Sequence, residues 1–308
     1  DGLRAQAQAP QVPWTFNTGK AIRPAAVLPV TSEAAAQQAL AQARAAGQGF
    51  AVRSGGHCFE GLSQHAAMVL NLGPLNHLAW DGPDHLRAGP GATIGAVNQM
   101  TGPQGRVLPA GFCQGVALGG HISGGGIGLL ARAYGLACDH MEAARVVLAD
   151  GRAVTASASA HPDLFWALRG GGAGSFGLVT EYRLRLRPLA RARLIEFLWR
   201  GTPDEMARLA ALWQERAARL PRALGAGMVL SARRPDLVQA QALLYSTADD
   251  SVAIPAARAL FDIAPVFTDP SVTIQPIHDV ADQIWPRSYN PSQDTKLGSS
   301  LQRRASSA

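Results

Sequence analysis

The chain has 308 residues, of which 47% are hydrophobic and 16% are charged. This composition is typical of one large or two ordinary globular domains, and it excludes a disordered chain. The formal net charge is +6, but the basic residues are scattered, and no Lys/Arg block predicts a nucleic-acid surface. No apolar run approaches the ~18 residues that span a bilayer. We therefore expect a soluble protein with neither nucleic acid nor a membrane as a partner.

The start of the sequence and its cysteines leave the cellular compartment open. The chain begins at Asp1, and a Gln/Ala-rich stretch predicts a flexible lead over residues 1–21. Either a signal segment has been removed or the sequence is a fragment. The three cysteines, Cys58, Cys113 and Cys138, are too few and odd in number for a disulfide framework. At least one thiol is therefore left for chemistry.

In chain order, the first elements expected are short strands around one helix. Residues 24–30 are expected to be extended. The helix after them should have Thr31 or Ser32 as its N-cap and should end at Gly47. Further elements are expected as strands over 50–52 and 68–72 and a helix over 93–101.

A β-hairpin and another helix are expected next. Asp150-Gly151 is a favoured two-residue turn between a strand over 141–148 and its return strand. Pro162 suits the first turn of a helix that should end in the glycines at 170–172.

From residue 178 onward the pattern predicts antiparallel strands. Residues 178–186 alternate between one mostly apolar face and another that carries mostly polar or arginine residues, as in a half-buried strand, and Pro188 should close it. A second region begins near Arg191, with strands expected over 194–199, 228–231 and 240–245 and helices over 203–220 and 250–261. Strands and helices mixed in this order predict an α+β fold with two unlike halves.

Two glycine-embedded motifs carry the chemistry that the sequence predicts. RSGGH (53–57) follows a predicted buried strand, and GFC (111–113) opens a second glycine-rich stretch. Taken alone, His57 would more often be structural, and Cys113 would more often be a small buried hydrophobe. The glycines next to both residues leave the backbone around them without side chains. This instead favours a His57 imidazole and a reactive Cys113 thiolate that face a ligand. A wide, flat ligand that needs close backbone approach and covalent attachment fits this pattern.

Two further glycine runs have the same character. The run over 119–128 is either a flexible loop or a turn that holds a pyrophosphate through backbone N–H groups. It is neither a Rossmann fingerprint nor a Walker loop, because its spacing fits neither. A third run covers 170–177. Three such clusters in fixed order with a histidine and a cysteine favour one shared ligand site.

These motifs resemble those of the berberine bridge enzyme-like branch of the vanillyl-alcohol oxidase superfamily, which has a PCMH-type FAD-binding domain. The matching segments are RSGGHCFEG (53–61), GFCQGVALGGHISGGGIG (111–128), YGLACDHM (134–141), LADGR (148–152) and DLFWALRGGGAGSFGLVT (163–180). The resemblance implies an α+β fold, in which a two-part FAD-binding domain over 22–190 precedes a smaller, partial antiparallel-sheet substrate domain over 191–308.

The resemblance also implies the cofactor, FAD, and its bicovalent attachment. His57 matches the histidine that is joined to the flavin 8α-methyl group, and Cys113 matches the cysteine joined to flavin C6. Val116 matches the position that controls oxygen access, and its small branched side chain is similar to that of oxygen-reactive members. The cofactor-binding residues implied by the match are Arg53, Ser54, Gly55, Gly56, His57, Cys113, Val116, Gly119, Gly120, His121, Gly124, Gly125, Gly128, Asp139, Gly177 and Val179.

The activity implied by the resemblance is that of an FAD-linked oxidase. Such an enzyme takes hydride from an alcohol, a sugar or a secondary metabolite to flavin N5, and dioxygen reoxidises the flavin with release of hydrogen peroxide. Family members usually continue further and bring a C-terminal segment with the catalytic base back to the FAD domain. No counterpart of that segment is found before Ala308, so the catalytic residue is unassigned, with Tyr134 and Tyr289 as candidates. The alternative is a truncated, non-catalytic flavin-binding paralogue or fragment; no metal site is expected in either case.

Overall fold

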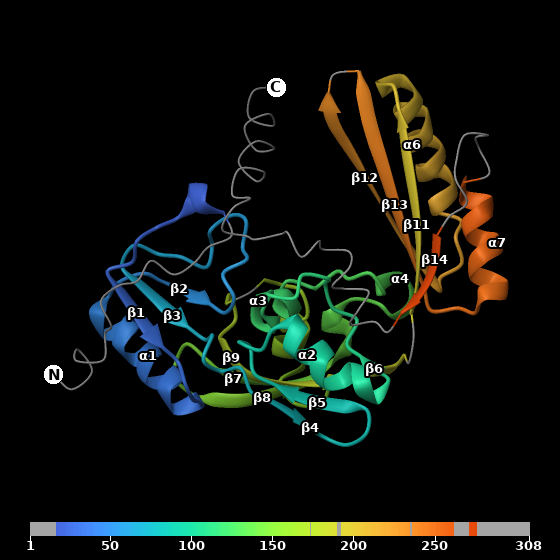
Figure 1. Cartoon of the computed structure of the whole chain (residues 1–308). Helices are drawn as coiled ribbons and strands as arrows, with labels where there is room; N and C mark the ends of the chain where they lie inside the picture. The colour runs from blue at the N-terminus through green and yellow to red at the C-terminus, as the bar shows by residue number, and fades with distance from the viewer. Residues whose placement is uncertain (1–16, 173, 190–191, 235, 262–270, 276–308) are drawn as a thin grey trace.

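The computed structural model describes residues 17–172, 174–189, 192–234, 236–261 and 271–275. A first part holds a three-stranded and a five-stranded sheet with short helices, and a second part holds a four-stranded antiparallel sheet with two helices (Figure 1). The fold is therefore α+β with two unlike parts, as the sequence predicts.

A three-stranded parallel sheet and one helix open the first part. The strand order is β1-β3-β2, so both outer strands pair with β3. Helix α1 begins after Ser32, whose Oγ accepts the Ala35 N–H at 3.1 Å, and it ends at Gly47 with a φ of 60°. These two caps confirm the helix ends that the sequence predicts. The elements are β1 (Ala26–Pro29), α1 (Glu33–Ala46), β2 (Phe50–Arg53) and β3 (Met68–Asn71).

A five-stranded antiparallel sheet in the order β4-β5-β9-β7-β8 forms the base of the first part. Its central strand β9 buries alternate residues such as Tyr182 and Leu184, and this confirms the predicted half-buried strand. Two helices, α2 and α3, pack their buried isoleucines and leucines into the core that includes these side chains. The strands are β4 (Leu78–Trp80), β5 (His85–Ala88), β7 (Met141–Val147), β8 (Ala153–Ser157) and β9 (Leu178–Arg185), and the helices are α2 (Ile94–Thr101), α3 (Leu118–Ser123), α4 (Ala131–Tyr134) and α5 (Pro162–Leu168).

Shorter elements complete the first part. Two two-residue strands, β6 (Arg106–Val107) and β10 (Arg187–Pro188), pair antiparallel. Three 3₁₀ turns cover Thr18–Lys20, Gly102–Gln104 and Ala137–His140.

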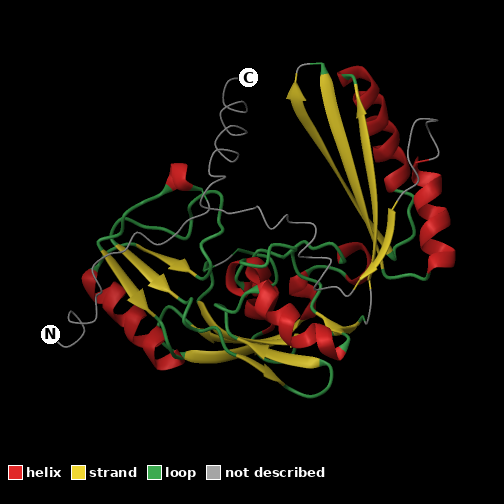
Figure 2. Cartoon of the chain, in the orientation of Figure 1, coloured by secondary structure: helices red, strands yellow, loops and turns green. Residues whose placement is uncertain are grey.

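The second part is a four-stranded antiparallel sheet covered on one face by two helices (Figure 2). Its strand order is β12-β13-β11-β14. The side chains of Ile195, Phe197 and Trp199 face helices α6 and α7 and form a second hydrophobic core with them. The elements are β11 (Ala192–Gly201), α6 (Pro203–Ala217), β12 (Leu224–Arg234), β13 (Leu237–Ser246), α7 (Asp250–Phe261) and β14 (Ser271–Gln275).

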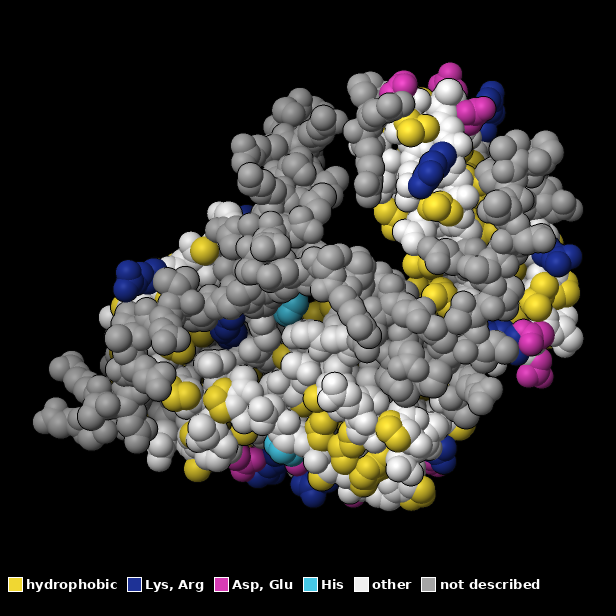
Figure 3. Space-filling view, viewed as in Figure 1, with side chains coloured by type: hydrophobic (Ala, Val, Ile, Leu, Met, Phe, Trp, Pro, Cys, Tyr) yellow, Lys and Arg dark blue, Asp and Glu magenta, His cyan; other side chains and the backbone are white. Residues whose placement is uncertain are grey.

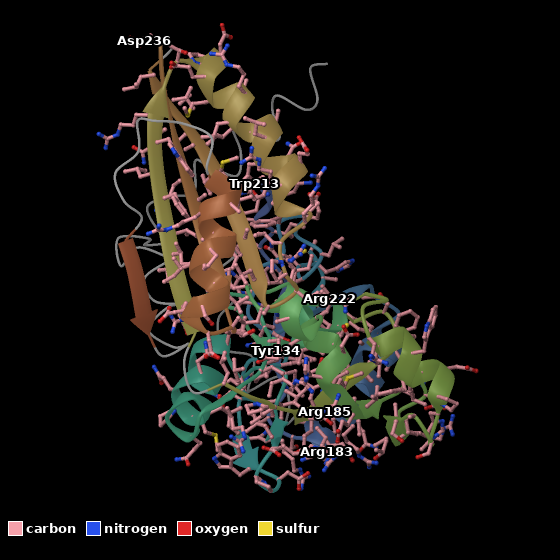
Figure 4. All side chains as sticks on the ribbon, turned by 90° about the vertical axis from the view of Figure 1, so that its right-hand side faces the viewer. Tyr134, Arg183, Arg185, Trp213, Arg222 and Asp236 are labelled. Atoms are coloured by element: carbon pink, nitrogen blue, oxygen red, sulfur yellow. The ribbon has the colours of Figure 1, made fainter. Side chains whose placement is uncertain are left out.

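A small joint connects the base of this sheet to the first part. Leu129 packs against Tyr245 and Leu194, which lie on the sheet face opposite the two helices. The Arg132 guanidinium in α4 donates a hydrogen bond to the Leu220 carbonyl at 2.6 Å. Figure 4 labels Tyr134 and Arg222, which lie two residues after Arg132 and Leu220 and mark this region. The joint therefore places one face of the sheet next to the segment that contains Leu129.

Three local features differ from the sequence-based expectations. The Leu148 N–H bonds to the Arg152 carbonyl at 2.8 Å, so the β7–β8 loop holds three residues rather than two. Part of the glycine run over 119–128 is helical, because α3 covers Leu118–Ser123. The short strands β4, β5 and β6 carry no clear alternating pattern in the sequence.

No helix in the described ranges is long and apolar enough to cross a membrane.

Candidate cofactor site

A cavity of about 710 Å³ lies where the three glycine-rich segments meet. Its volume is within the range of small-molecule and cofactor pockets. The loop after β2, the loop before α3, the helix α3 itself and strand β9 supply most of its wall. The lining residues that the sequence predicted are Ser54, Gly55, Gly56, His57, Cys113, Val116, Gly119, Gly120, His121, Gly177 and Val179.

The first two glycine motifs contact each other directly. A Cβ atom placed on Gly55 would lie 2.9 Å from both the Cβ and the backbone nitrogen of Ala117. Because real Cβ atoms do not approach so closely, only glycine at position 55 allows this packing. The contact brings the loop of His57 and the loop of Cys113 to the same cavity, although 56 residues separate them in the sequence.

Helix α3 forms one wall of the cavity and is held from below by β9. The Tyr182 hydroxyl donates a hydrogen bond to the Gly119 carbonyl at 3.2 Å and lies 3.0 Å from the Ser123 hydroxyl. Burial raises the pKa of Tyr182 to about 12, so the phenol stays protonated and remains a donor. Tyr182 and Ser123 both line the cavity. The sequence marked Tyr182 only as a core position of β9, and it marked Ser123 only as part of the matching segment over 111–128.

His57 is held as a neutral imidazole. Burial lowers its pKa, while a hydrogen bond to the backbone of Gly115 acts in the opposite direction, and the Arg53 charge lowers it slightly further. Arg53 itself is buried at the end of β2 and does not line the cavity. A neutral ring keeps a lone pair on one nitrogen, which is the form that can act as a nucleophile.

Cys113 lies in the turn that precedes α3, where its carbonyl accepts the Val116 N–H at 3.1 Å. Burial raises the pKa of its thiol. At neutral pH the protonated thiol is therefore favoured in this structure, whereas the sequence interpretation favoured a reactive thiolate. The side chain is one of three free cysteines in the described residues, with Cys58 and Cys138.

His121 ties α3 to the start of the Cys113 loop. The Gly111 N–H donates a hydrogen bond to His121 Nε2 at 2.8 Å. This bond requires an unprotonated Nε2, so the neutral ring carries its proton on Nδ1. Burial also lowers the pKa of His121, which favours the same neutral form.

We expect the free energy of unfolding to fall as the pH is lowered from about 7.5 to about 5.5, in part because of His121. Its folded-state pKa lies below the unfolded value of about 6.5. The stability contributed by the neutral ring is therefore complete above that unfolded value and is lost as the pH falls through the folded pKa. Denaturant titrations of the wild type and of His121→Gln check this. The glutamine carbonyl can still accept the Gly111 N–H but does not titrate, so the variant should lose less stability. Equal losses in the two proteins would assign the pH dependence to other groups.

Five predicted site residues lie outside the cavity wall. Asp139 pairs with Arg169 at 3.1 Å and accepts the Leu136 N–H at 2.9 Å, so it stabilises a turn instead. The five residues are Arg53, Gly124, Gly125, Gly128 and Asp139.

The structure does not bring the candidate base Tyr134 to the cavity. The Tyr134 ring lies beneath the Arg187 guanidinium, 5.1 Å from its centroid, and its hydroxyl lies 3.5 Å from the Pro188 carbonyl. This position gives a catalytic role no support. Tyr289 lies outside the described residues.

The loop after His57 adds lining residues that the sequence interpretation missed. Cys58, Phe59, Leu62 and Ser63 all face the cavity, and Phe59 and Leu62 remain exposed at its edge. The only indication of these residues in the sequence was that they follow the RSGGH motif. The Ser63 Oγ atom is buried without a hydrogen-bond partner among the described residues. A polar ligand atom would satisfy it, since buried hydroxyls are nearly always bonded.

A second concavity, of about 830 Å³, lies on the other side of the five-stranded sheet. Its polar side chains are paired with each other: Arg87 with Glu181 at 2.6 Å, Arg145 with Glu33 at 2.5 Å, and Arg183 with Asp81 at 2.6 Å. Figure 4 shows Arg183 at the end of the molecule farthest from the second part. None of the three glycine runs lines it. The glycine-lined cavity is therefore the better candidate for a ligand.

The cavity fits a flavin nucleotide on three features of its wall. Backbone from the glycine segments is open to it, and a Cβ on Gly120 would meet nothing within 4 Å. Two nucleophilic side chains, His57 and Cys113, border it. The unpartnered Ser63 hydroxyl supplies a polar group. Among the described residues, no cluster of three or more His, Cys, Asp or Glu side chains is placed to hold a metal ion.

Comparisons with known proteins agree with this fit. Residues 24–157 match the protein family described as FAD binding domain. This part of the chain is thus a PCMH-type FAD-binding domain. The homologues of the chain include berberine bridge enzyme-like proteins and other FAD-linked oxidoreductases.

Two curated relatives and one solved structure illustrate the similarity. The chain is 42% identical over 174 residues to aclacinomycin-N/aclacinomycin-A oxidase of Streptomyces galilaeus, covering 53% of this chain and 32% of that protein. It is 31% identical over 250 residues to berberine bridge enzyme-like 12 of Arabidopsis thaliana, covering 77% of this chain and 47% of the relative. The structure of Physcomitrella patens BBE-like 1 superposes with a TM-score of 0.80 at 23% identity, over 91% of this chain and 62% of that one. The chain thus spans less than half the length of these two curated relatives.

Proposed function

We propose that the chain is an FAD-linked oxidase whose flavin is attached to both His57 and Cys113. The observation that carries the proposal is the convergence of these two side chains, from separate glycine-rich loops, on one cavity. The described lining residues include no Asp, Glu, Lys or Arg. Backbone N–H groups of the glycine segments would therefore hold the cofactor's pyrophosphate.

The residues around the cavity have distinct roles in this proposal. His57 stays neutral and so keeps a lone pair for attachment to a carbon atom of the cofactor. Cys113 would need to lose its proton, and its buried thiol does so less readily than an exposed one. His121 fixes the backbone two residues before Cys113, and Tyr182 fixes the Gly119 carbonyl.

When FAD is bound, it supplies the chemistry of hydride acceptance from a substrate carbon and of electron transfer to dioxygen. For an alcohol, the balanced reaction converts the CH–OH group and dioxygen to a carbonyl group and hydrogen peroxide. The proton of the substrate hydroxyl has to pass to a base. We assign no described side chain to that role. In this proposal the FAD-binding domain covers 22–190, and 191–308 contribute to the substrate side.

The absorbance spectrum of the purified protein before and after acid precipitation tests the proposal. We expect a flavin spectrum that stays with the precipitate, and peroxide release with a substrate alcohol. Flavin in the pellet without peroxide for any alcohol or sugar would favour a flavin-binding protein that is not an oxidase. A protein expressed with excess riboflavin that holds no flavin would contradict the proposal.

A larger side chain at position 116 is expected to limit the access of dioxygen to the cofactor. Val116 lines the cavity, and its carbonyl accepts the Ile94 N–H at 2.9 Å, so its backbone is fixed. Val116→Leu should slow reoxidation of the reduced protein about tenfold, which corresponds to a barrier raised by ~1.4 kcal/mol. Stopped-flow mixing of reduced protein with dioxygen measures the rate. Val116→Ala, which removes bulk at the same site, should be no slower than the wild type, and an unchanged rate in Val116→Leu would remove this residue from the oxygen path.

A further inference from the structure

Strand β12 is an unusually long edge strand for this molecule. The four-stranded sheet has the order β12-β13-β11-β14, so β12 pairs with β13 on one side and with no described strand on the other. It has 11 residues, whereas the described edge strands β1, β2, β4, β8 and β14 have three to five residues each. Short edge strands protect a sheet against pairing with another chain. The β12 edge lacks this protection.

The sequence of β12 also lacks residues that block an edge. Residues 224–232 read LGAGMVLSA, with neither a charged residue nor a proline, although lysine and proline are common on natural edge strands. The register shift of β12 against β13 comes later, between Ala232 and Arg234. Val229 is 59% exposed and Leu230 is 46% exposed. Figure 3 shows hydrophobic side chains along the border of the second part where β12 lies in Figure 1.

Alternate residues of β12 direct their backbone polar groups away from the sheet. The Thr247 N–H donates to the Ala223 carbonyl at 2.9 Å, and these two residues continue the strand register by one position. In an antiparallel pair, directly opposed residues alternate between pairs that exchange hydrogen bonds and pairs that do not. The odd-numbered residues after Ala223 therefore bond to β13. The even-numbered residues Ala226, Met228 and Leu230 point their N–H and C=O groups outward, where no described strand pairs with them.

The side chains of β12 are complementary to those of a second β12 that runs antiparallel to it. With Met228 on a two-fold axis, Leu230 lies opposite Ala226 of the second copy, and Val229 lies opposite Gly227. Each exposed apolar side chain thus meets a small residue. A Cβ on Gly227 would meet nothing within 4 Å, so there is room for the Val229 methyl groups. A register shift of two residues removes this match, because Val229 then lies opposite either itself or Gly225.

We propose that β12 is the interface of a two-fold dimer, in which the β12 strands of two copies pair antiparallel about Met228 and join the two sheets into one. Residues 226–230 of the two copies exchange about six backbone hydrogen bonds. Burial of Val229 and Leu230 from each copy adds a hydrophobic contribution. The pairing stops before Gly225, because its close approach to the Leu129 carbonyl oxygen holds the base of β12 in the joint.

The size of this interface sets the expected affinity. One pair of short strand segments is smaller than the interfaces of obligate dimers, so we expect a dissociation constant of about 1–100 μM. None of the residues of this interface lines the cofactor cavity. The proposal therefore stands apart from the proposed oxidase function, and either one can fail without the other.

Sedimentation velocity on the full chain, at protein concentrations from about 2 to about 200 μM, tests the proposal. We expect the wild type to change from monomer to dimer over this range. Met228→Pro should raise the dissociation constant by at least about tenfold, because proline removes an outward N–H and places its ring on the pairing edge. The variant loses no hydrogen bond to β13, since proline is tolerated on an edge strand where the N–H faces away from the sheet.

A second variant and a matched control keep the test decisive. Leu230→Lys places a charge on the edge and should weaken the dimer similarly, so it decides the outcome if Met228→Pro fails to fold. Leu198→Lys is the control, because Leu198 is 45% exposed, close to the 46% of Leu230, but lies in β11 between two paired strands. It should leave the dissociation constant unchanged. A wild type that stays monomeric, an unchanged dimer in folded Met228→Pro and Leu230→Lys, equal weakening by Leu198→Lys, or assemblies larger than a dimer would overturn the proposal.

Discussion

The double variant His57→Ala/Cys113→Ala is expected to release all its flavin into the supernatant on acid precipitation, whereas either single variant should keep flavin in the pellet. The physical reason is that each side chain provides one independent covalent link. The two links start from loops that meet only through tertiary contacts such as Gly55 on Ala117. Absorbance of the pellet and the supernatant after precipitation measures the outcome.

Cys58→Ala is the matched control for this experiment. Cys58 is also a free thiol on the cavity wall and is the immediate neighbour of His57. If attachment depends on the particular position of Cys113, the Cys58 variant should retain flavin as the wild type does. Loss of flavin from Cys58→Ala, or retention by the double variant, would contradict the attachment at His57 and Cys113. A single variant that releases all its flavin would show that only one link exists.

Local sequence signals predicted most regular elements correctly. Helix α1 was predictable because Ser32 and Gly47 cap its two ends. Each cap makes its hydrogen bond to a backbone group only a few residues away in the sequence. Strand β9 was predictable because the alternation over 178–186 reports directly on which side chains are buried. The strands and helices of the second part follow the same logic, and α6 also has a capping box between Thr202 and Glu205.

The features that escaped prediction depend on contacts between distant segments. Asp139 lies within a matching motif, but its carboxylate is engaged by Arg169, 30 residues away. The sequence pattern around Tyr182 indicates only that its side chain faces the core. Its hydrogen bond to Gly119 exists because α3 lies over β9. The helical start of the run over 119–128 is likewise stabilised by packing of Leu118 and Ile122 into the core, against the low helix propensity of glycine.

The glycine-rich motifs that the sequence singled out line one cavity, which is the candidate site. Glycines at 55 and 119 indicated close approach, and the structure shows what approaches: Ala117 in one case and Ser54 with Pro90 in the other. The spacing of the glycines alone does not say which glycines face a ligand and which face neighbouring parts of the protein. That distinction separates Gly119 from Gly120, although they are consecutive residues of one helix.

Gly119→Ala is expected to destabilise the protein by about 1–3 kcal/mol and to lower its flavin content, because the added methyl group overpacks the contact between the first two motifs. Its Cβ would overlap Ser54 Oγ and would lie 3.0 Å from Pro90 Cβ and 3.1 Å from the Pro90 carbonyl oxygen. Gly120→Ala is the control, since its Cβ meets no atom within 4 Å and an alanine costs less backbone entropy in a helix than glycine does. Denaturant titration gives the free energy of unfolding of each variant.

A double-mutant cycle with Ser54→Ala identifies the source of the strain. Removal of the Ser54 hydroxyl relieves the closest contact, so Gly119→Ala should cost less in the Ser54→Ala background, by roughly 0.5 kcal/mol or more. The contacts with Pro90 remain in both backgrounds, so the recovery should be partial. Full additivity of the two substitutions would assign the strain to Pro90 alone. Equal stability of Gly119→Ala and Gly120→Ala would contradict the close approach of the two motifs at Gly119, on which the shape of the cavity depends.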